Sequence, residues 1–188
     1  MRLFLYGSKS FADTVAGLVV DAGHELAGLI DDQDRGDQIA GSFDEVSGDH
    51  AGGDAGLVMA IGYKDLPSRW LAWQRVRAAG WKVPTLVHPR AYVSSTAVLG
   101  AGTILMAGAI VDQRCRLGQA VVVWPGACIN HDCEVGDNSF ISPAAVLCGS
   151  VRVGAHSFIG AGALVVDGGE LPPSSFVRMG ERITSRRP

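Results

Sequence analysis

A branched aliphatic residue recurs at every sixth position through the second half of the chain, from Val87 to Val177. A six-residue period fits neither the 3.6-residue turn of an α-helix nor the two-residue alternation of a strand. It is typical of a parallel β-helix, so the pattern predicts a β-helix of about five coils, with three hexapeptides in each coil. The sixteen positions of this series are Val87, Val93, Leu99, Leu105, Val111, Leu117, Val123, Ile129, Val135, Ile141, Leu147, Val153, Ile159, Val165, Leu171 and Val177.

Residues 1–86 follow a different pattern, in which short apolar runs alternate with stretches of helical spacing. This alternation predicts a small, Rossmann-like parallel α/β domain with helices on the faces of its sheet. The segment 32–50 is polar and rich in turn residues, with one helical turn expected at 43–46. Strands are expected at 2–6, 25–30 and 55–61, a fourth extended segment at 81–87, and helices at 11–22 and 64–79.

The repeat begins without a long linker, and Pro89 marks the change of pattern. The sequence therefore predicts two domains, 1–86 and 87–177. We expect residues 178–188 to form a C-terminal tail that breaks the repeat and is basic at its end.

Charge and composition exclude several classes of partner. The formal net charge is −3, which gives no electrostatic basis for binding nucleic acid or an anionic membrane. No apolar run approaches the about 18 residues of a membrane span, and the run at residues 1–7 is too short for the core of a signal peptide. We therefore expect a cytoplasmic protein with no nucleic-acid or membrane partner.

All four cysteines lie in the repeat, at Cys115, Cys128, Cys133 and Cys148. Cys115 and Cys133 are eighteen residues apart and would stack on neighbouring coils, so a disulfide between them is conceivable. The favoured interpretation is that cysteine fills a narrow corner as a small hydrophobic residue. Neither the cysteines nor the five histidines have the spacing of a metal site, so no metal is expected.

One polar cluster, Asn130-His131-Asp132, stands out among the exterior positions of the repeat. His131 comes two places after an inward aliphatic residue, which places it at a turn and pointing outward. A histidine with a carboxylate neighbour is a common general base near neutral pH, and Asp132 provides that carboxylate. Gly149, eighteen residues later, would leave space beside the imidazole for a slender ligand. The alternative is a solvent-exposed histidine with no function.

A second group of candidate residues comes from the ends of the predicted strands in residues 1–86. The turn Gly7-Ser8-Lys9 leads from a strand into a helix, where backbone N–H groups can hold a phosphate. Asp31 and Asp32 end the second strand, where an acid often accepts hydrogen bonds from a ribose or a base. Tyr63 and Lys64 follow the third strand at the same edge. A helix cap or an ordinary turn is an equal alternative for the two aspartates.

Together these residues resemble the bacterial sugar acyltransferases of the left-handed β-helix superfamily. The branch is the one that contains the sialic-acid O-acetyltransferases and the bacillosamine-pathway and perosamine N-acetyltransferases. The resemblance covers nearly the whole chain. It rests on the Gly7 turn, Asp31-Asp32, Ala60-Ile61-Gly62, His88-Pro89 and the hexapeptides that carry Asn130-His131-Asp132-Cys133.

The resemblance implies a left-handed β-helix that forms a homotrimer, with acetyl-CoA bound between neighbouring coils. His131 would take a proton from the acceptor sugar, and Asp132 would hold that histidine. Backbone around Gly149 and Ala161, from the neighbouring subunit, would line the path of the pantetheine arm. Phe140, the third residue expected at the cofactor, stands where some relatives have a second histidine near the acetyl carbonyl.

The resemblance also implies that the first domain binds the nucleotide of an activated sugar, with Asp31 and Asp32 near the base. Nitrogen-acetylating relatives often carry Gly-Gly-His-Gly in the first turn, where this chain has Ser8-Lys9-Ser10-Phe11. From the sequence and this resemblance, we expect an acetyl-CoA-dependent N-acetyltransferase that acts on a nucleotide-linked amino sugar in surface-polysaccharide synthesis. Sugar O-acetylation is the near alternative, and a non-catalytic nucleotide-sugar-binding scaffold is the distant one.

Overall fold

A computed structural model describes residues 1–184; residues 185–188 of the expected tail lie outside the described residues. The chain divides into two compact units, with the boundary between Leu86 and Val87. The first is called the α/β unit below, and the second the β-helix. Among the described residues, no helix is long and apolar enough to cross a membrane.

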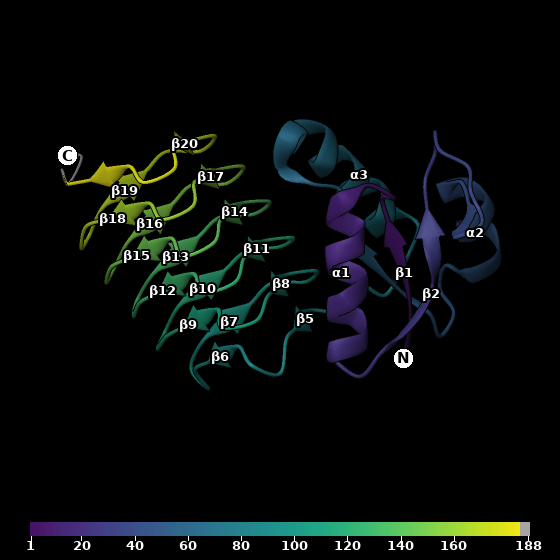
Figure 1. Cartoon of the computed structure of the whole chain (residues 1–188), viewed down its shortest axis with the longest axis horizontal. Coiled ribbons are helices and arrows are strands. Elements are labelled where there is room, and N and C mark those ends of the chain that lie inside the picture. The colour runs from purple at the N-terminus through teal and green to yellow at the C-terminus, as the bar shows by residue number, and fades with distance from the viewer. Residues whose placement is uncertain (185–188) are drawn as a thin grey trace. The chain divides into compact units, whose positions relative to one another are not determined.

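The α/β unit has a four-stranded parallel sheet in the order β3-β2-β1-β4, and its first strands run side by side in Figure 1. Helix α2 begins at a capping box in which Ser42 and Glu45 exchange hydrogen bonds, and the side chain of Asp65 caps the first turn of α3. The elements are β1 (Arg2–Tyr6), α1 (Ser10–Asp21), β2 (Glu25–Ile30), β3 (Ile39–Gly41), α2 (Phe43–His50), β4 (Gly56–Met59), the 3₁₀ helix η1 (Tyr63–Asp65) and α3 (Leu66–Ala78).

Three β-sheets form the β-helix, and each strand pairs in parallel with the strand three places further along the chain. Figure 1 shows the coils as successive layers. The strands are β5 (Leu86–Val87), β6 (Tyr92–Val93), β7 (Val98–Leu99), β8 (Ile104–Leu105), β9 (Ile110–Val111), β10 (Arg116–Leu117), β11 (Val122–Val123), β12 (Cys128–Ile129), β13 (Glu134–Val135), β14 (Phe140–Ile141), β15 (Val146–Leu147), β16 (Arg152–Val153), β17 (Phe158–Ile159), β18 (Leu164–Val165), β19 (Glu170–Leu171), β20 (Phe176–Val177) and β21 (Arg182–Ile183).

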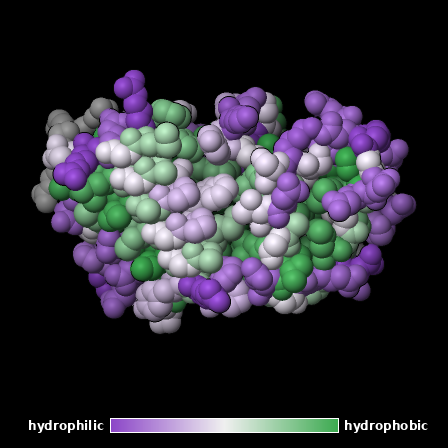
Figure 2. Space-filling model, viewed as in Figure 1, coloured by the Kyte–Doolittle hydropathy of each residue, from purple (hydrophilic) through white to green (hydrophobic). Residues whose placement is uncertain are grey.

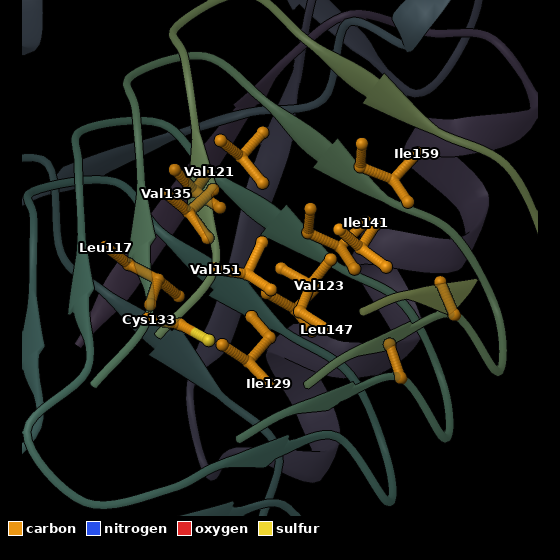
Figure 3. Close-up of a cluster of buried hydrophobic side chains, with 14 of the residues drawn as sticks. Leu117, Val121, Val123, Ile129, Cys133, Val135, Ile141, Leu147, Val151 and Ile159 are labelled. Carbon is orange, nitrogen blue, oxygen red and sulfur yellow. The ribbon is translucent and has the colours of Figure 1, made fainter. Parts of the chain in front are cut away.

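Partners in this pairing are eighteen residues apart, as in Cys128 with Val146 and Ile129 with Leu147. The second residue of each strand points inward, and these side chains form one continuous buried cluster (Figure 3). The predicted parallel β-helix of about five coils after a small α/β region is therefore confirmed. Hydrophobic residues also reach the surface on the side seen in Figure 2.

Two expectations about individual segments were wrong. The fourth strand of the first sheet is β3, which lies in a segment expected to be turns and pairs with the outer edge of β2. The extended segment expected at 81–87 meets this sheet only through the bridge between Lys82 and Gly56, and the chain then enters the β-helix. The repeat also continues past Val177, since β21 pairs with β18.

Candidate active site

His131 and Asp132 form the turn that connects β12 with β13, as the repeat predicted. Asp132 has a φ of 59°, a left-handed conformation that Asp tolerates better than most residues. The His131 side chain is 54% exposed, and so it is open to a ligand.

Asp132 binds the imidazole directly, with 2.9 Å between its Oδ2 and Nδ1 of His131. A carboxylate only accepts hydrogen bonds, so Nδ1 carries the proton in this pair. In the neutral imidazole, the other ring nitrogen, Nε2, then has a lone pair, which is what a general base requires.

Arg114 completes this group, although it was not identified from the sequence. Its Nε donates to Asp132 Oδ1 at 2.6 Å, and its Nη2 donates to Oδ2 at 2.8 Å. These bonds, with the one from His131, hold the pKa of Asp132 well below its usual range. The signal was present in the sequence, because Arg114 stands eighteen residues before Asp132 and so occupies the same turn position one coil earlier.

Gly149 lies directly against the imidazole, one coil after His131. A Cβ at this position would come within 2.6 Å of Cε1 and 2.8 Å of Nε2 of His131. The imidazole itself therefore fills the space that was expected to receive a ligand. The glycine is needed because only the absence of a side chain lets the ring lie there.

Side chains of Asn130, Cys115 and Cys133 hold the backbone on both sides of this turn. Asn130 donates from its amide to the Leu147 carbonyl at 2.8 Å, and the Cys115 thiol lies 2.9 Å from the Asn130 carbonyl. The Cys133 thiol contacts the Cys148 carbonyl at 3.0 Å. All four cysteines are free thiols, and Cys115 and Cys133 are fully buried, as expected of small residues that fill a corner.

Phe140 and Ala161 do not lie beside His131 within one chain. Phe140 is fully buried on β14, and Ala161 lies at the turn between β17 and β18, which is another edge of the β-helix. Their expected part in binding the pantetheine arm stays a prediction.

The α/β unit contains a cavity of about 290 Å³ at the carboxyl ends of β1, β2 and β4. Gly7 is required at its floor, because it has a φ of 123° and a Cβ there would lie 2.7 Å from the Ala60 carbonyl oxygen. Tyr63 and Lys64 are not among the lining residues but begin η1 directly after Gly62. The cavity is lined by Tyr6, Gly7, Ser8, Lys9, Asp31, Asp32, Gln33, Ala60, Ile61 and Gly62.

Both aspartates of this cavity are held by groups of the chain itself. Asp31 accepts from the Ser8 hydroxyl at 2.6 Å and from the backbone amides of Gln33 and Asp34, both at 2.9 Å. Burial acts to raise the pKa of Asp31, but these hydrogen bonds outweigh it and lower the pKa. Lys9 pairs with Asp34 at the rim.

Asp32 accepts from the Tyr6 hydroxyl at 2.5 Å, from the Phe43 amide at 2.8 Å and from Arg75 at 2.8 Å. Against the effect of burial, these donors lower the pKa of Asp32. Burial and the neighbouring carboxylate raise the pKa of Tyr6 to about 12. Neither Tyr6 nor Arg75, which lies far along the chain on α3, was identified from the sequence.

A larger groove of about 700 Å³ runs along the sheet of β10, β13, β16 and β19. Arg116, Glu134, Arg152 and Glu170 line it with alternating charge, and Arg152 pairs with Glu170 at 3.0 Å. None of the residues predicted to be functional lines this groove. In the part of the chain that is described, no three His, Cys, Asp or Glu side chains are grouped to hold a metal ion.

The sequence matches the family described as bacterial transferase hexapeptide (six repeats) over residues 114–147 and 132–167. These residues include Arg114, His131, Asp132 and Gly149, so the candidate site lies inside the matched hexapeptide coils. No curated protein matches the chain.

Among the solved structures that resemble the chain are two acetyltransferases. The acetyltransferase domain of PglB from Neisseria gonorrhoeae is 27% identical, with a TM-score of 0.88 over 100% of this chain and 93% of that one. A variant of perosamine N-acetyltransferase from Caulobacter crescentus, solved with CoA and GDP-perosamine, is also 27% identical, with a TM-score of 0.77 over 95% and 93%. The resemblance expected from the sequence is thus confirmed, and the hexapeptide coils and the α/β unit both lie within it.

Proposed function

We propose that this protein is an acetyl-CoA-dependent N-acetyltransferase that acts on a nucleotide-linked amino sugar in the synthesis of a surface polysaccharide. The observation that carries the proposal is the His131–Asp132 pair on a hexapeptide coil, with Nδ1 bonded to the carboxylate and Nε2 free to accept a proton. Of the two similar structures described above, one is an acetyltransferase domain, and the other is an N-acetyltransferase solved with CoA and a nucleotide-linked amino sugar.

In the proposed reaction, Nε2 of His131 accepts a proton from the sugar amine as the amine nitrogen attacks the thioester carbonyl carbon. The C–N bond forms, the C–S bond breaks, and the imidazolium returns its proton to the departing CoA sulfur. Asp132 keeps the ring oriented and stabilises the imidazolium. A general base of this kind contributes about 10²–10⁴-fold, and alignment of the amine with the thioester supplies much of the remainder.

The cavity at the carboxyl ends of β1, β2 and β4 is proposed to take the nucleotide. Ligands of open parallel sheets bind at this edge, and Gly7 brings the backbone close to the cavity. Because the carboxylates of Asp31 and Asp32 are already bonded within the chain, their role here is to fix the cavity wall. The exposed Lys9 at the rim adds a positive charge suited to a phosphate.

A homotrimer, with active sites between subunits, belongs to the same proposal. The outward residues of β6, β9, β12, β15 and β18 are Tyr92, Ile110, Cys128, Val146 and Leu164, and Tyr92 is 55% exposed. This apolar column contrasts with the charged column of β10, β13, β16 and β19, and it suits burial against a second subunit. Light scattering in solution tests the trimer. A cytoplasmic location stays a prediction.

The test of the proposed function is the change His131→Ala, assayed by acetyl-CoA consumption with UDP-, GDP- and dTDP-linked amino sugars. We expect kcat to fall at least about a hundredfold, while calorimetry shows acetyl-CoA binding unchanged. His156→Gln, at another turn of the β-helix, is the control and should keep its rate. A near-normal rate for His131→Ala would exclude this base, and no binding of any CoA species would favour a scaffold.

A further inference from the structure

Arg114 is fixed by its own surroundings before it meets Asp132. It lies in the turn between β9 and β10, with a φ of 57°. Its backbone amide donates to the Thr96 hydroxyl at 3.0 Å, and that hydroxyl contacts the Ser94 hydroxyl at 3.0 Å. Its Nη1 reaches the Gln113 side-chain oxygen at 3.3 Å. A side chain anchored in this way presents its guanidinium at a defined place.

The guanidinium and the imidazole share one carboxylate. Arg114 binds both oxygens of Asp132, and Oδ2, which receives Nη2, is also the atom bonded to His131 Nδ1. A two-point bond between arginine and a carboxylate fixes the carboxylate plane as well as its charge. Since His131 is anchored on this carboxylate at one edge and lies over Gly149 at the other, its orientation depends on Arg114.

Two further acids lie around the group formed by Arg114, Asp132 and Gly149. Asp112 acts on Arg114 from the same coil. Asp167 has Oδ1 3.1 Å from the position of a Gly149 Cβ, and its charge reaches Cys148 beside that glycine. A negative charge beside an imidazole favours its protonated form, in which Nε2 is no longer a base, and a positive charge favours the neutral form. Arg114 supplies a positive charge from one coil before His131.

We propose that Arg114 is a positioning residue of the acetyl transfer, which clamps Asp132 so that this carboxylate orients His131 without holding the imidazole in its protonated form. The inference rests on the proposed function and adds to it the control of the base by a cation on the preceding coil. It acts through Asp132 and touches neither substrate.

The test compares Arg114→Gln with Arg114→Lys in the full chain at constant ionic strength. For Arg114→Gln we expect kcat near pH 7 to fall about tenfold, and the midpoint of the acidic limb of the pH–rate profile to rise by about 0.5–1 pH unit. The KM for acetyl-CoA should not change. Arg114→Lys should return the midpoint toward that of the wild type, because the charge is kept, but should restore the rate only in part, because the two-point bond is lost.

The matched control is Arg152→Gln, which removes another exposed arginine that pairs with an acid one coil away. It should leave both the rate and the profile unchanged. If Arg114→Gln lowers the rate in parallel at every pH, with an unmoved midpoint, Arg114 only supports the fold and the proposal is overturned. An equal shift of the midpoint in Arg152→Gln would overturn it as well.

Titration of the His131 ring by NMR, on the same proteins and without substrate, separates this inference from the proposed function. The titration midpoint should rise in Arg114→Gln even if no sugar acceptor has been found. An unmoved midpoint overturns the role of Arg114 while leaving the acetyltransferase proposal intact. If the midpoint rises in a protein that transfers no acetyl group, the coupling between Arg114 and His131 is supported, and only the proposed acetyl transfer is contradicted.

Discussion

The two units each place an arginine against an aspartate, but they do so in different ways. In the β-helix, Arg114 and Asp132 are eighteen residues apart, the same interval that separates His131 from Gly149. In the α/β unit, Asp32 takes its partners from 26 residues before it and 43 residues after it. In the β-helix, the residues that contact each other can thus be predicted from their separation along the sequence. In the α/β unit they cannot, because its fold has no repeat.

The two aspartates also differ in what they leave free. Asp32 accepts hydrogen bonds from a phenol, a backbone amide and an arginine of the same chain. Such a carboxylate is suited to supporting the wall of the cavity. Asp132 is bonded to an arginine and to a histidine whose second nitrogen remains open. This difference supports the proposal that proton transfer takes place in the β-helix and nucleotide binding in the α/β unit.

The largest effect expected from this comparison comes from Gly149→Ala. Its methyl group would lie 2.6 Å from the imidazole, so the ring must leave its place, while the backbone of this glycine is not in the left-handed region. We expect kcat to fall about a hundredfold or more, with little change in the melting temperature.

Gly126→Ala is the control for that change. A Cβ there meets nothing within 4 Å, and Ala144 already adopts a φ of 56° one coil later. This variant should keep its activity. If Gly149→Ala keeps a normal rate as well, then the imidazole does not lie over Gly149 in the working enzyme.

The same contrast explains what could be predicted from the sequence. The six-residue series determines the coils, because a parallel β-helix gives each position a fixed direction, and this places His131 and Asp132 at a turn. The eighteen-residue interval that relates Gly149 to His131 also relates Arg114 to Asp132, but Arg114 was not predicted from it. Ile183 continues the series, but the charged Glu181 and Arg182 beside it obscured the last strand.

In the α/β unit the sequence predicted β1 and β2 with the bounds that the structure shows. It did not predict β3, which has three residues and is held at the sheet edge by backbone bonds, such as that from the Asp31 amide to the Gly41 carbonyl. Nor could it pair Arg75 with Asp32, since no period connects a helix residue with a strand end. Such contacts depend on how the helices pack on the sheet.

An effect of intermediate size, on the binding of the nucleotide sugar, is expected from Arg75→Gln in the α/β unit. Arg75 bonds Asp32 at 2.8 Å, the Tyr6 hydroxyl at 3.1 Å and Asp44 at 2.6 Å, so its loss loosens one wall of the cavity. We expect the KM for the nucleotide sugar to rise about tenfold, at a cost of about 1.4 kcal/mol. The kcat and the KM for acetyl-CoA should hardly change.

Arg77→Gln, two residues further along α3, is the matched control, because Arg77 stacks over Trp73 instead of binding Asp32. Steady-state kinetics with each substrate varied in turn distinguishes the outcomes. Equal changes in the KM for both substrates would show that the two units do not divide binding and chemistry as proposed.

The smallest effect is a loss of stability of the α/β unit in acid. Asp31 and Asp32 have folded-state pKa values below those of unfolded aspartates, near 3.9, because hydrogen bonds from Ser8, Tyr6 and backbone amides outweigh burial. The stabilisation that these two carboxylates give to the α/β unit is therefore complete above about pH 4 to 5 and is lost as the pH falls through their lower folded-state pKa values.

The double variant Asp31→Asn with Asp32→Asn should flatten this pH dependence of stability, whereas Asp37→Asn, at an exposed position, should not. Tryptophan fluorescence in urea follows the transition, since Trp70, Trp73 and Trp81 lie in the α/β unit. An equally steep acid dependence in the double variant would show that the closed aspartate groups do not stabilise this unit.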